Sequence, residues 1–334
     1  MNNPTSYLRL GALALFWGAS FLLIKLGLEA LSPTQIALAR IVLGALTLLA
    51  ICAVRGLRTA LTLLAICAVR GLRIPGDRVL WRHVAVAAVF ANALPWVLLA
   101  VGEQTVESGL AGVLNATTPL WTVLFGLLAG REALPPRRAA GLLLGFLGVL
   151  VIFAPWQGGG MLGWGVLACV AASASYGIGF VYTGRFITGR GTPPLALASM
   201  QLTAAIGFSV LALPLDGLRM VHWEPVALLA VLALGVVGTG IGFALNYRLI
   251  GDEGATTAST VTYVMPIFSV LLGWLLLGEQ LPLRVILGMV VVLLGVALTH
   301  RKTPGAPALL TRAGRSFARA SELYADLARN HPMK

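Results

Sequence analysis

The most constraining feature of this sequence is a series of apolar blocks, each about as long as a membrane is thick. The blocks hold roughly 20 residues, the length that crosses a hydrocarbon core. Hydrophobic residues make up 58% of the chain and charged residues 11%, against about 25% charged in soluble domains. Because unpaired backbone groups are costly in lipid, we predict that the blocks are helices. The predicted spans are 8–30, 34–54, 83–101, 109–129, 139–155, 161–183, 194–214, 225–247, 256–277 and 283–300.

Basic residues are distributed unevenly between the two sides of these spans. If the N-terminus lies inside, twenty Lys and Arg residues fall in inner loops and termini, and only Arg219 and Arg284 in outer loops. The positive-inside rule therefore predicts that both termini are cytoplasmic. The net charge of +12 is scattered over short loops and a tail, not along a groove, so no nucleic-acid partner is expected. Membrane lipids are the expected surroundings.

The chain also repeats itself. Residues 98–149 overlay 245–296 without a gap when shifted by 147 positions. Each half of the chain holds five predicted helices, an odd number, so the second half must enter the membrane upside down. We therefore predict an all-α membrane protein in which ten transmembrane helices form two inverted five-helix repeats, at 8–155 and 161–300. Inverted repeats with a binding site between them are typical of transporters. The matched pairs include Pro119 with Pro266, Glu132 with Glu279, and Gly148 with Gly295.

Two segments depart from this pattern. Residues 45–58 are repeated identically at 60–73. The second copy is too short between its arginines to span a bilayer, so we predict that it lengthens the helix beyond the membrane or lies along the inner interface. The basic tail, 301–334, is expected to be cytoplasmic. It either forms an amphipathic helix on anionic lipid or is a disordered solvated segment.

Polar residues inside the spans are the candidates for a substrate site, because they are costly in lipid and usually face the protein interior. Asn92 and Trp96 lie four apart on one helical face, and the shift maps Asn92, Trp96 and Leu99 onto Thr239, Phe243 and Asn246. Aromatic walls with uncharged hydrogen-bonding groups suit an amphipathic organic solute. The alternative is that the hydroxyl residues hold helices together. The candidate substrate-binding residues are Trp17, Ser20, Asn92, Trp96, Asn115, Thr118, Tyr176, Asn246, Thr262 and Tyr263.

Two prolines and two in-span charges call for separate interpretation. Pro119 and Pro266 are either hinges that open each side of a cavity in turn or static kinks. Lys25 and Arg40 either form an electropositive lining that attracts a carboxylate or extend toward the outer surface. In the second case they could pair with an acidic side chain. The acidic candidates are Glu29, Glu103 and Glu107.

The residues missing from the spans are also informative. No Asp, Glu or His lies near the middle of a predicted span, whereas proton-driven carriers typically need such a group. We therefore expect facilitated diffusion or coupling through a group that the pattern does not reveal. No cluster of nucleophiles, metal ligands or paired carboxylates stands out, so we expect no enzyme activity, no metal and no cofactor. Glu132 and Glu279, at helix ends, are interpreted as loop anchors.

Three stretches make the chain resemble the drug/metabolite transporter superfamily, EamA type. The first is Phe16-Trp17-Gly18-Ala19-Ser20-Phe21 with Lys25, and the second is Ala39-Arg40 after Ser32-Pro33. The third is used twice, as Pro119…Arg131-Glu132…Leu134-Pro135 and as Pro266…Gly278-Glu279…Leu281-Pro282. The resemblance implies ten helices, cytoplasmic termini and a central cavity formed mainly by helices 3, 4, 8 and 9. It covers residues 8–300 and says little about the substrate.

These observations together predict an integral-membrane transporter in a bacterial inner (plasma) membrane. It would move a small organic metabolite, amino acid-like or drug-like, by alternating access. The resemblance implies outward transport. A membrane enzyme or a lipid translocator on the same ten-helix scaffold is the alternative.

Overall fold

The computed structural model describes residues 4–54, 78–130, 135–153, 163–187, 194–216, 219–253, 258 and 260–300. The second copy of the duplication, the tail and Glu132 lie outside these residues. Within them the first half contains α1 (Pro4–Gly27), α2 (Pro33–Val54), α4 (Arg78–Ala88), η1 (Val89–Ala93), α5 (Leu94–Glu103), α6 (Ser108–Asn115), α7 (Thr118–Leu128) and α8 (Pro136–Phe153). The second half contains α9 (Trp164–Phe186), α10 (Pro194–Ala212), η3 (Leu213–Asp216), α11 (Pro225–Ala233), η4 (Leu234–Ile241), α12 (Gly242–Glu253), α14 (Val261–Leu277) and α15 (Leu283–His300).

The helices form a multi-pass membrane bundle. Among the described residues, five helical stretches are long and apolar enough to cross a membrane, and four shorter apolar helices accompany them. Together with α8 they give ten helical passes that match the predicted spans to within a few residues. The long stretches are Thr5–Gly27, Arg78–Glu103, Ser108–Leu128, Trp164–Phe186 and Pro225–Ile250.

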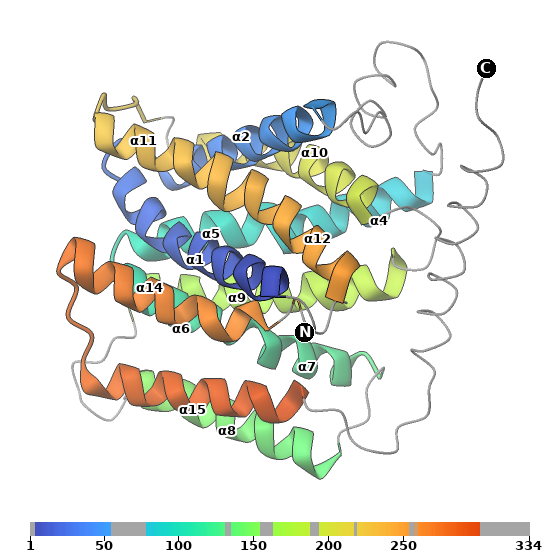
Figure 1. The fold of residues 1–334 in the computed structure, drawn as a ribbon, viewed down its shortest axis with the longest axis vertical. Helices are drawn as coiled ribbons and strands as arrows, with labels where there is room; N and C mark the ends of the chain where they lie inside the picture. Colours follow the sequence, from blue (N-terminus) through green and yellow to red (C-terminus); the bar gives the residue numbers. More distant parts are fainter. Residues whose placement is uncertain are drawn as a thin grey trace.

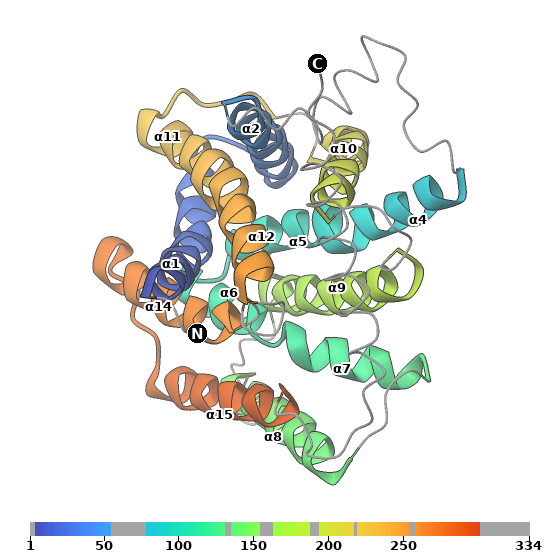
Figure 2. The same cartoon turned by 45° about the vertical axis from the view of Figure 1, so that its right-hand side comes forward.

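The two halves run in opposite directions. α8 and α15 correspond under the shift of 147 and lie side by side at one edge of the bundle (Figures 1 and 2). Their contacts are made through glycines. A Cβ on Gly295 would overlap Gly145, one on Gly148 would lie 2.7 Å from Val292 N, and one on Gly288 would lie 2.5 Å from Ile152. Contact positions rise along α8 as they fall along α15, so the helices are antiparallel. The inverted repeat is therefore confirmed.

The halves also share their core, because helices of each half pack against helices of the other half. α1 packs against α14, and its counterpart α9 packs against α6 and α7. α2 packs against η4, and α10 packs against η1 and α4. Each half thus surrounds the first helix of the other half, and residues far apart in sequence meet in the middle of the bundle.

The fourth pass differs from the prediction. It was expected to be one helix with Pro119 in its interior, but α6 ends at Asn115 and α7 begins at Thr118. Pro119 therefore lies in the first turn of α7, where a missing N–H costs no hydrogen bond. Pro266 does lie inside α14. The two prolines occupy matched positions in the sequence but different positions in their helices, and the hinge role stays a prediction.

Candidate functional site

The third pass of each half is interrupted by a π-helical segment, η1 in the first half and η4 in the second. Asn92 lies in η1 and Thr239 in η4, and the shift of 147 superposes them. π segments are rare and frequent at functional sites. In η1 the cause is local. Pro95 has no N–H to donate to the carbonyl four residues back, and the Leu94 N–H instead bonds Val89 O.

Side-chain hydroxyls bond carbonyl groups of both π segments. Ser175 on α9 donates to Phe90 O at 2.8 Å, and Thr239 donates to Leu234 O at 3.1 Å. A π segment leaves carbonyls without their α-helical partner, and a buried carbonyl must find another. The two segments are therefore held in place by tertiary contacts and by their own side chains.

Arg40 on α2 reaches the η4 segment of the other half. Its Nε donates to Thr239 Oγ1 at 3.2 Å, and its guanidinium carbon lies 4.2 Å from the centre of the Trp96 ring. α2 approaches this closely because Gly44 faces Thr239, where a Cβ would lie 2.5 Å from the threonine methyl group. Arg40 is only 7% exposed. Extension to the outer surface, one alternative for Arg40, is therefore wrong.

The charge of Arg40 has no close acidic partner in the part of the chain that the structure describes. The salt bridges found there, within 4.0 Å, join Asp252 to Arg9 and to Arg248. The predicted ion pair of Arg40 with an acidic side chain is thus absent among these residues. A buried guanidinium of this kind is a candidate binding group for an anion.

Two aromatic pairs join the halves, and one of them contains Trp96, which lies against Arg40. Trp17 and Phe243 meet edge to face with ring centres 6.5 Å apart, and the Trp96 indole lies within side-chain hydrogen-bonding reach of Tyr176. The repeat relates Trp96 to Phe243, while Trp17 and Tyr176 belong to the first helix of each half. Trp96, Tyr176 and Phe243 share one apolar cluster. We call Arg40, Trp96, Tyr176, Thr239 and Phe243 the Arg40 cluster.

Two buried amide groups of the first half have unused hydrogen-bonding capacity, and one of them lies one helical turn before Trp96. Asn92 is 4% exposed, and its Oδ1 is buried without a partner among the described residues. The Oδ1 of Asn115, at the end of α6, is in the same condition. A buried polar atom without a partner costs about 1–3 kcal/mol, so both oxygens are candidates to accept a hydrogen bond from a ligand. Asn246 is half-buried on α12, one turn after Phe243.

Other predicted site residues bond to the main chain. Ser20 donates to Phe16 O at 2.9 Å and Thr118 to Asn115 O at 2.8 Å. The Tyr263 hydroxyl donates to a carbonyl of α15 at 3.4 Å, which directs it toward the edge helices. Thr262 is half-buried on α14. Of these three bonds, that of Tyr263 joins two helices, whereas those of Ser20 and Thr118 are local. The role of these residues in binding stays a prediction.

Lys25 lies at the far end of α1 and also differs from the prediction. Its Nζ donates to the main-chain oxygens of Glu103 at 2.7 Å and Val106 at 2.9 Å. Among the described residues no salt bridge joins Lys25 to a carboxylate, so the ion pair, one of the alternatives for Lys25, is wrong. The ammonium group instead neutralises the partial negative charge of main-chain carbonyl groups at the C-terminal end of α5, where a cation is favoured.

Glu279 joins the two halves beside Lys25. Its carboxylate accepts hydrogen bonds from Ser108 N at 2.7 Å, Ser108 Oγ at 3.0 Å and Gly109 N at 2.9 Å. An anion is stabilised at this position because the first N–H groups of a helix have no partner within it. Glu279 thus anchors its loop to the start of α6. Burial, followed by the charge of Glu279, raises the pKa of neighbouring Glu107.

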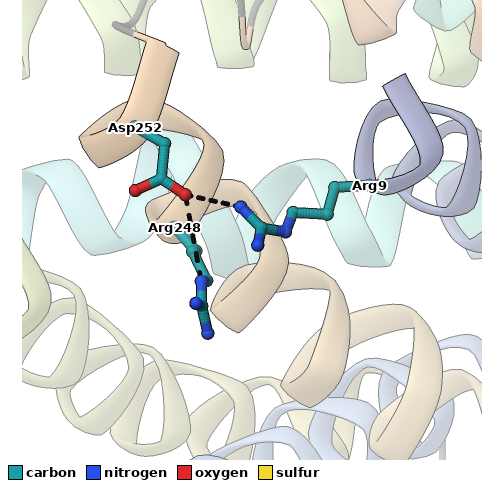
Figure 3. Close-up of polar contacts among 3 residues, drawn as sticks. All are labelled: Arg9, Arg248 and Asp252. Carbon is teal, nitrogen blue, oxygen red and sulfur yellow. Dashed lines mark hydrogen bonds and ion pairs between the residues drawn. The ribbon is translucent and has the colours of Figure 1, made fainter. Parts of the chain in front are cut away.

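The opposite end of the bundle carries a second contact between halves. Arg9, near the start of α1, donates to the Asp252 carboxylate on α12, and Arg248 approaches the same carboxylate at 3.9 Å (Figure 3). All three side chains are partly exposed. Arg9 and Lys25 lie 16 residues apart on α1, about 24 Å at 1.5 Å per residue. The halves are thus joined by polar contacts at both ends.

Sequence reasoning missed the roles of three residues and both π segments. It recognised Thr239 and Phe243 only as mapped positions, and Glu103 only as an ion-pair partner. It did not foresee the π segments, although Pro95 inside an apolar span was a signal for one of them.

Comparison with known proteins identifies similar chains. The sequence model of the EamA-like transporter family matches residues 6–154 and again residues 163–301. An uncharacterized transporter of Archaeoglobus fulgidus is 26% identical over 290 residues, which cover 86% of this chain and 95% of that protein. The uncharacterized transporter YdfC of Bacillus subtilis is 29% identical over 290 residues, 86% of this chain and 88% of YdfC.

Two further similarities concern location and fold. The uncharacterized inner membrane transporter YedA of Escherichia coli K12 is 27% identical over 273 residues, 81% of this chain and 82% of YedA. A solved crystal structure has the same fold, with a TM-score of 0.58 and 22% sequence identity, over 89% of this chain and 96% of that one.

Proposed function

Since the chain belongs to the EamA-like transporter family, we propose that it moves a small amphipathic organic acid, such as an amino acid, across the inner membrane. The relatives are transporters and not enzymes, and the chain is a multi-pass membrane protein. The substrate's carboxylate would bind Arg40, and its apolar body would lie among the aromatic side chains of the Arg40 cluster. Asn92 and Asn115 would accept hydrogen bonds from the substrate.

The observation that carries this proposal is the burial of Arg40 and its hydrogen bonding. The guanidinium is buried and uses one N–H, that of Nε, in a bond to a described residue. Its two outer nitrogens form the planar fork that matches a carboxylate. A buried charge without a partner is costly, so a bound carboxylate would supply the missing counter-charge. The adjoining Trp96, Tyr176 and Phe243 provide the apolar surface typical of small-molecule sites.

The inverted halves support alternating access as the transport mechanism. Related transporters of inverted-repeat design move one repeat against the other around a central site. Arg9 meets Asp252 at one end of the interface, and Glu279 meets α6 at the other. Breaking each in turn would open each side. Outward transport and cytoplasmic termini remain predictions.

Matched ligands test the carboxylate site directly. Purified protein in detergent is titrated with L-phenylalanine and with L-phenylalaninamide, which lacks the carboxylate charge. A charge-assisted pair contributes about 1.5–3 kcal/mol, so the acid should bind about tenfold or more tightly. Arg40→Met should remove this preference while leaving the protein folded, because an apolar replacement of a buried charge is often tolerated.

Arg248→Met is the control, because it removes an exposed arginine of the same bundle. It should keep the preference for the acid. Equal binding of acid and amide to the unaltered protein, or binding confined to sugars, nucleosides or cationic drugs in the same screen, would refute the carboxylate site.

A further inference from the structure

Glu103, the last residue of α5, has an environment that the proposed transport function does not explain. It is 0% exposed, and neither carboxylate oxygen has a hydrogen-bond partner among the described residues. The expectation of uncoupled transport rested on the lack of acidic residues near the centres of the spans. Glu103 lies at the end of its span, yet it is as deeply buried as any core leucine.

The packing around Glu103 is tight. α5 and α9 are in backbone contact here through Gly102 and Gly165. A Cβ on Gly102 would lie 2.7 Å from Gly165 O, and one on Gly165 would lie 2.6 Å from Gly102 O. Cys169, one turn further along α9, is itself buried and also faces Gly102. Glu103 therefore follows directly on a close helix–helix contact, and its side chain is fully buried.

The charged groups that face Glu103 come from three elements. Lys25 on α1 uses its ammonium group on the main-chain oxygens of Glu103 and Val106. Arg40 on α2 is stacked on Trp96, and Glu279, which follows α14, is bonded to the N-terminus of α6. All three act on Glu103 electrostatically. In the described residues none forms a salt bridge to its carboxylate.

An ionised carboxylate in such a place would be buried without a donor, which is strongly unfavourable. A protonated carboxyl group is neutral and avoids most of this cost. Resting on the proposed transport function, we propose that Glu103 is a proton-binding site whose occupancy controls the binding of an anionic substrate at Arg40. In the conformation described here it holds a proton.

The coupling is electrostatic. An ionised Glu103 places a negative charge within the field of Arg40 and so competes with the substrate's carboxylate. A protonated Glu103 leaves the positive charge of Arg40 available to the substrate. Proton and anion therefore bind cooperatively, and by reciprocity each strengthens the binding of the other. When the packing of α5 against α9 opens, the carboxyl group passes its proton to water, and Lys25 is placed to pair with the resulting carboxylate.

Infrared spectroscopy tests the proton site without any substrate. Purified protein in lipid nanodiscs is compared with Glu103→Gln and with the control Glu107→Gln, which removes a carboxylate one turn away that is partly exposed. At neutral pH the unaltered protein should show a protonated-carboxyl carbonyl band that shifts in deuterated water. The band should be missing in Glu103→Gln and present in Glu107→Gln. Identical spectra for all three proteins would overturn the proton site.

Ligand binding tests the coupling. The dissociation constant of L-phenylalanine for the unaltered protein should rise roughly fivefold or more between acidic and alkaline pH, within the usual range of coupling between sites. Glu103→Gln should bind tightly at every pH, because its side chain is permanently neutral, and Glu107→Gln should keep the pH dependence. A pH dependence that survives in Glu103→Gln would overturn the coupling. If L-phenylalanine does not bind at all, the carboxylate site is wrong, and the infrared result still decides whether Glu103 carries a proton.

Discussion

Replacing Glu279 by alanine tests the polar contact that joins the second half to the first at the start of α6. The wild-type carboxylate accepts three hydrogen bonds, at 2.7, 3.0 and 2.9 Å, from Ser108 and Gly109. Loss of a helix cap costs about 0.5–2 kcal/mol, and loss of an anion at a helix N-terminus about 0.3–1 kcal/mol. We expect a total near 2 kcal/mol, because the same atoms contribute to both effects.

Thermal unfolding of the purified protein in detergent, followed by intrinsic fluorescence, measures this cost. An unfolding entropy of about 2.1 cal/mol/K per residue gives about 0.7 kcal/mol/K for the 334 residues of this chain, so Glu279→Ala should lower Tm by roughly 3 °C. Gln280→Ala is the control, because Gln280 is exposed and adjacent. Its Tm should match that of the unaltered protein.

A double-mutant cycle with Gly273 sharpens the test. A Cβ on Gly273 would overlap the Glu279 carboxylate and would lie 2.9 Å from Ser108 Oγ. Gly273→Ala should therefore be destabilising in the unaltered protein and much less so beside Glu279→Ala. The expected coupling is about 0.5–3 kcal/mol, as for residues in contact. Strictly additive effects, or equal Tm values for Glu279→Ala and Gln280→Ala, would refute the assigned cap.

Three further perturbations follow from the fold. Gly295→Ala should lower Tm in detergent by the equivalent of about 1–3 kcal/mol, because its Cβ overlaps the backbone of α8, whereas Gly207→Ala, with open space around it, should not. Burial and the charge of Glu279 raise the pKa of Glu107, so Glu107 contributes stability at low pH that is lost as pH rises through its folded pKa. Glu107→Gln should flatten that part of the Tm–pH curve, and an unchanged curve would contradict the assignment. Pro95→Ala should restore an N–H that favours α over π geometry in the third pass, lowering L-phenylalanine binding without lowering Tm. Unchanged binding would show that the π geometry does not matter.

Much of the architecture followed from local properties of the sequence. The apolar blocks predicted the ten passes because hydropathy and length decide whether a segment can cross a bilayer. The shift of 147 predicted the equivalence of Trp96 with Phe243 and of Gly148 with Gly295, and both pairs lie at interfaces between the halves. The prediction failed for the fourth pass, because a proline pattern does not distinguish a kink inside a helix from the start of a new one.

The candidate site was predictable only in part. Helical spacing grouped Asn92 with Trp96 and placed Arg40 within its span. It could not show that Arg40 would meet Thr239, which is 199 residues away, or that Lys25 would bond main-chain oxygens instead of a carboxylate. A helical wheel gives the face on which a side chain lies but not what packs against that face.

The sequence by itself determined that this chain crosses a membrane many times and that its second half repeats the first upside down. These properties depend on residue type and spacing alone, and an odd number of passes per repeat leaves no other orientation. Only the tertiary structure decided which charged side chains are buried without an ion-pair partner among the described residues. Arg40 and Glu103 are buried because helices from both halves close around them, and burial is a property of the surrounding chain and not of the residue.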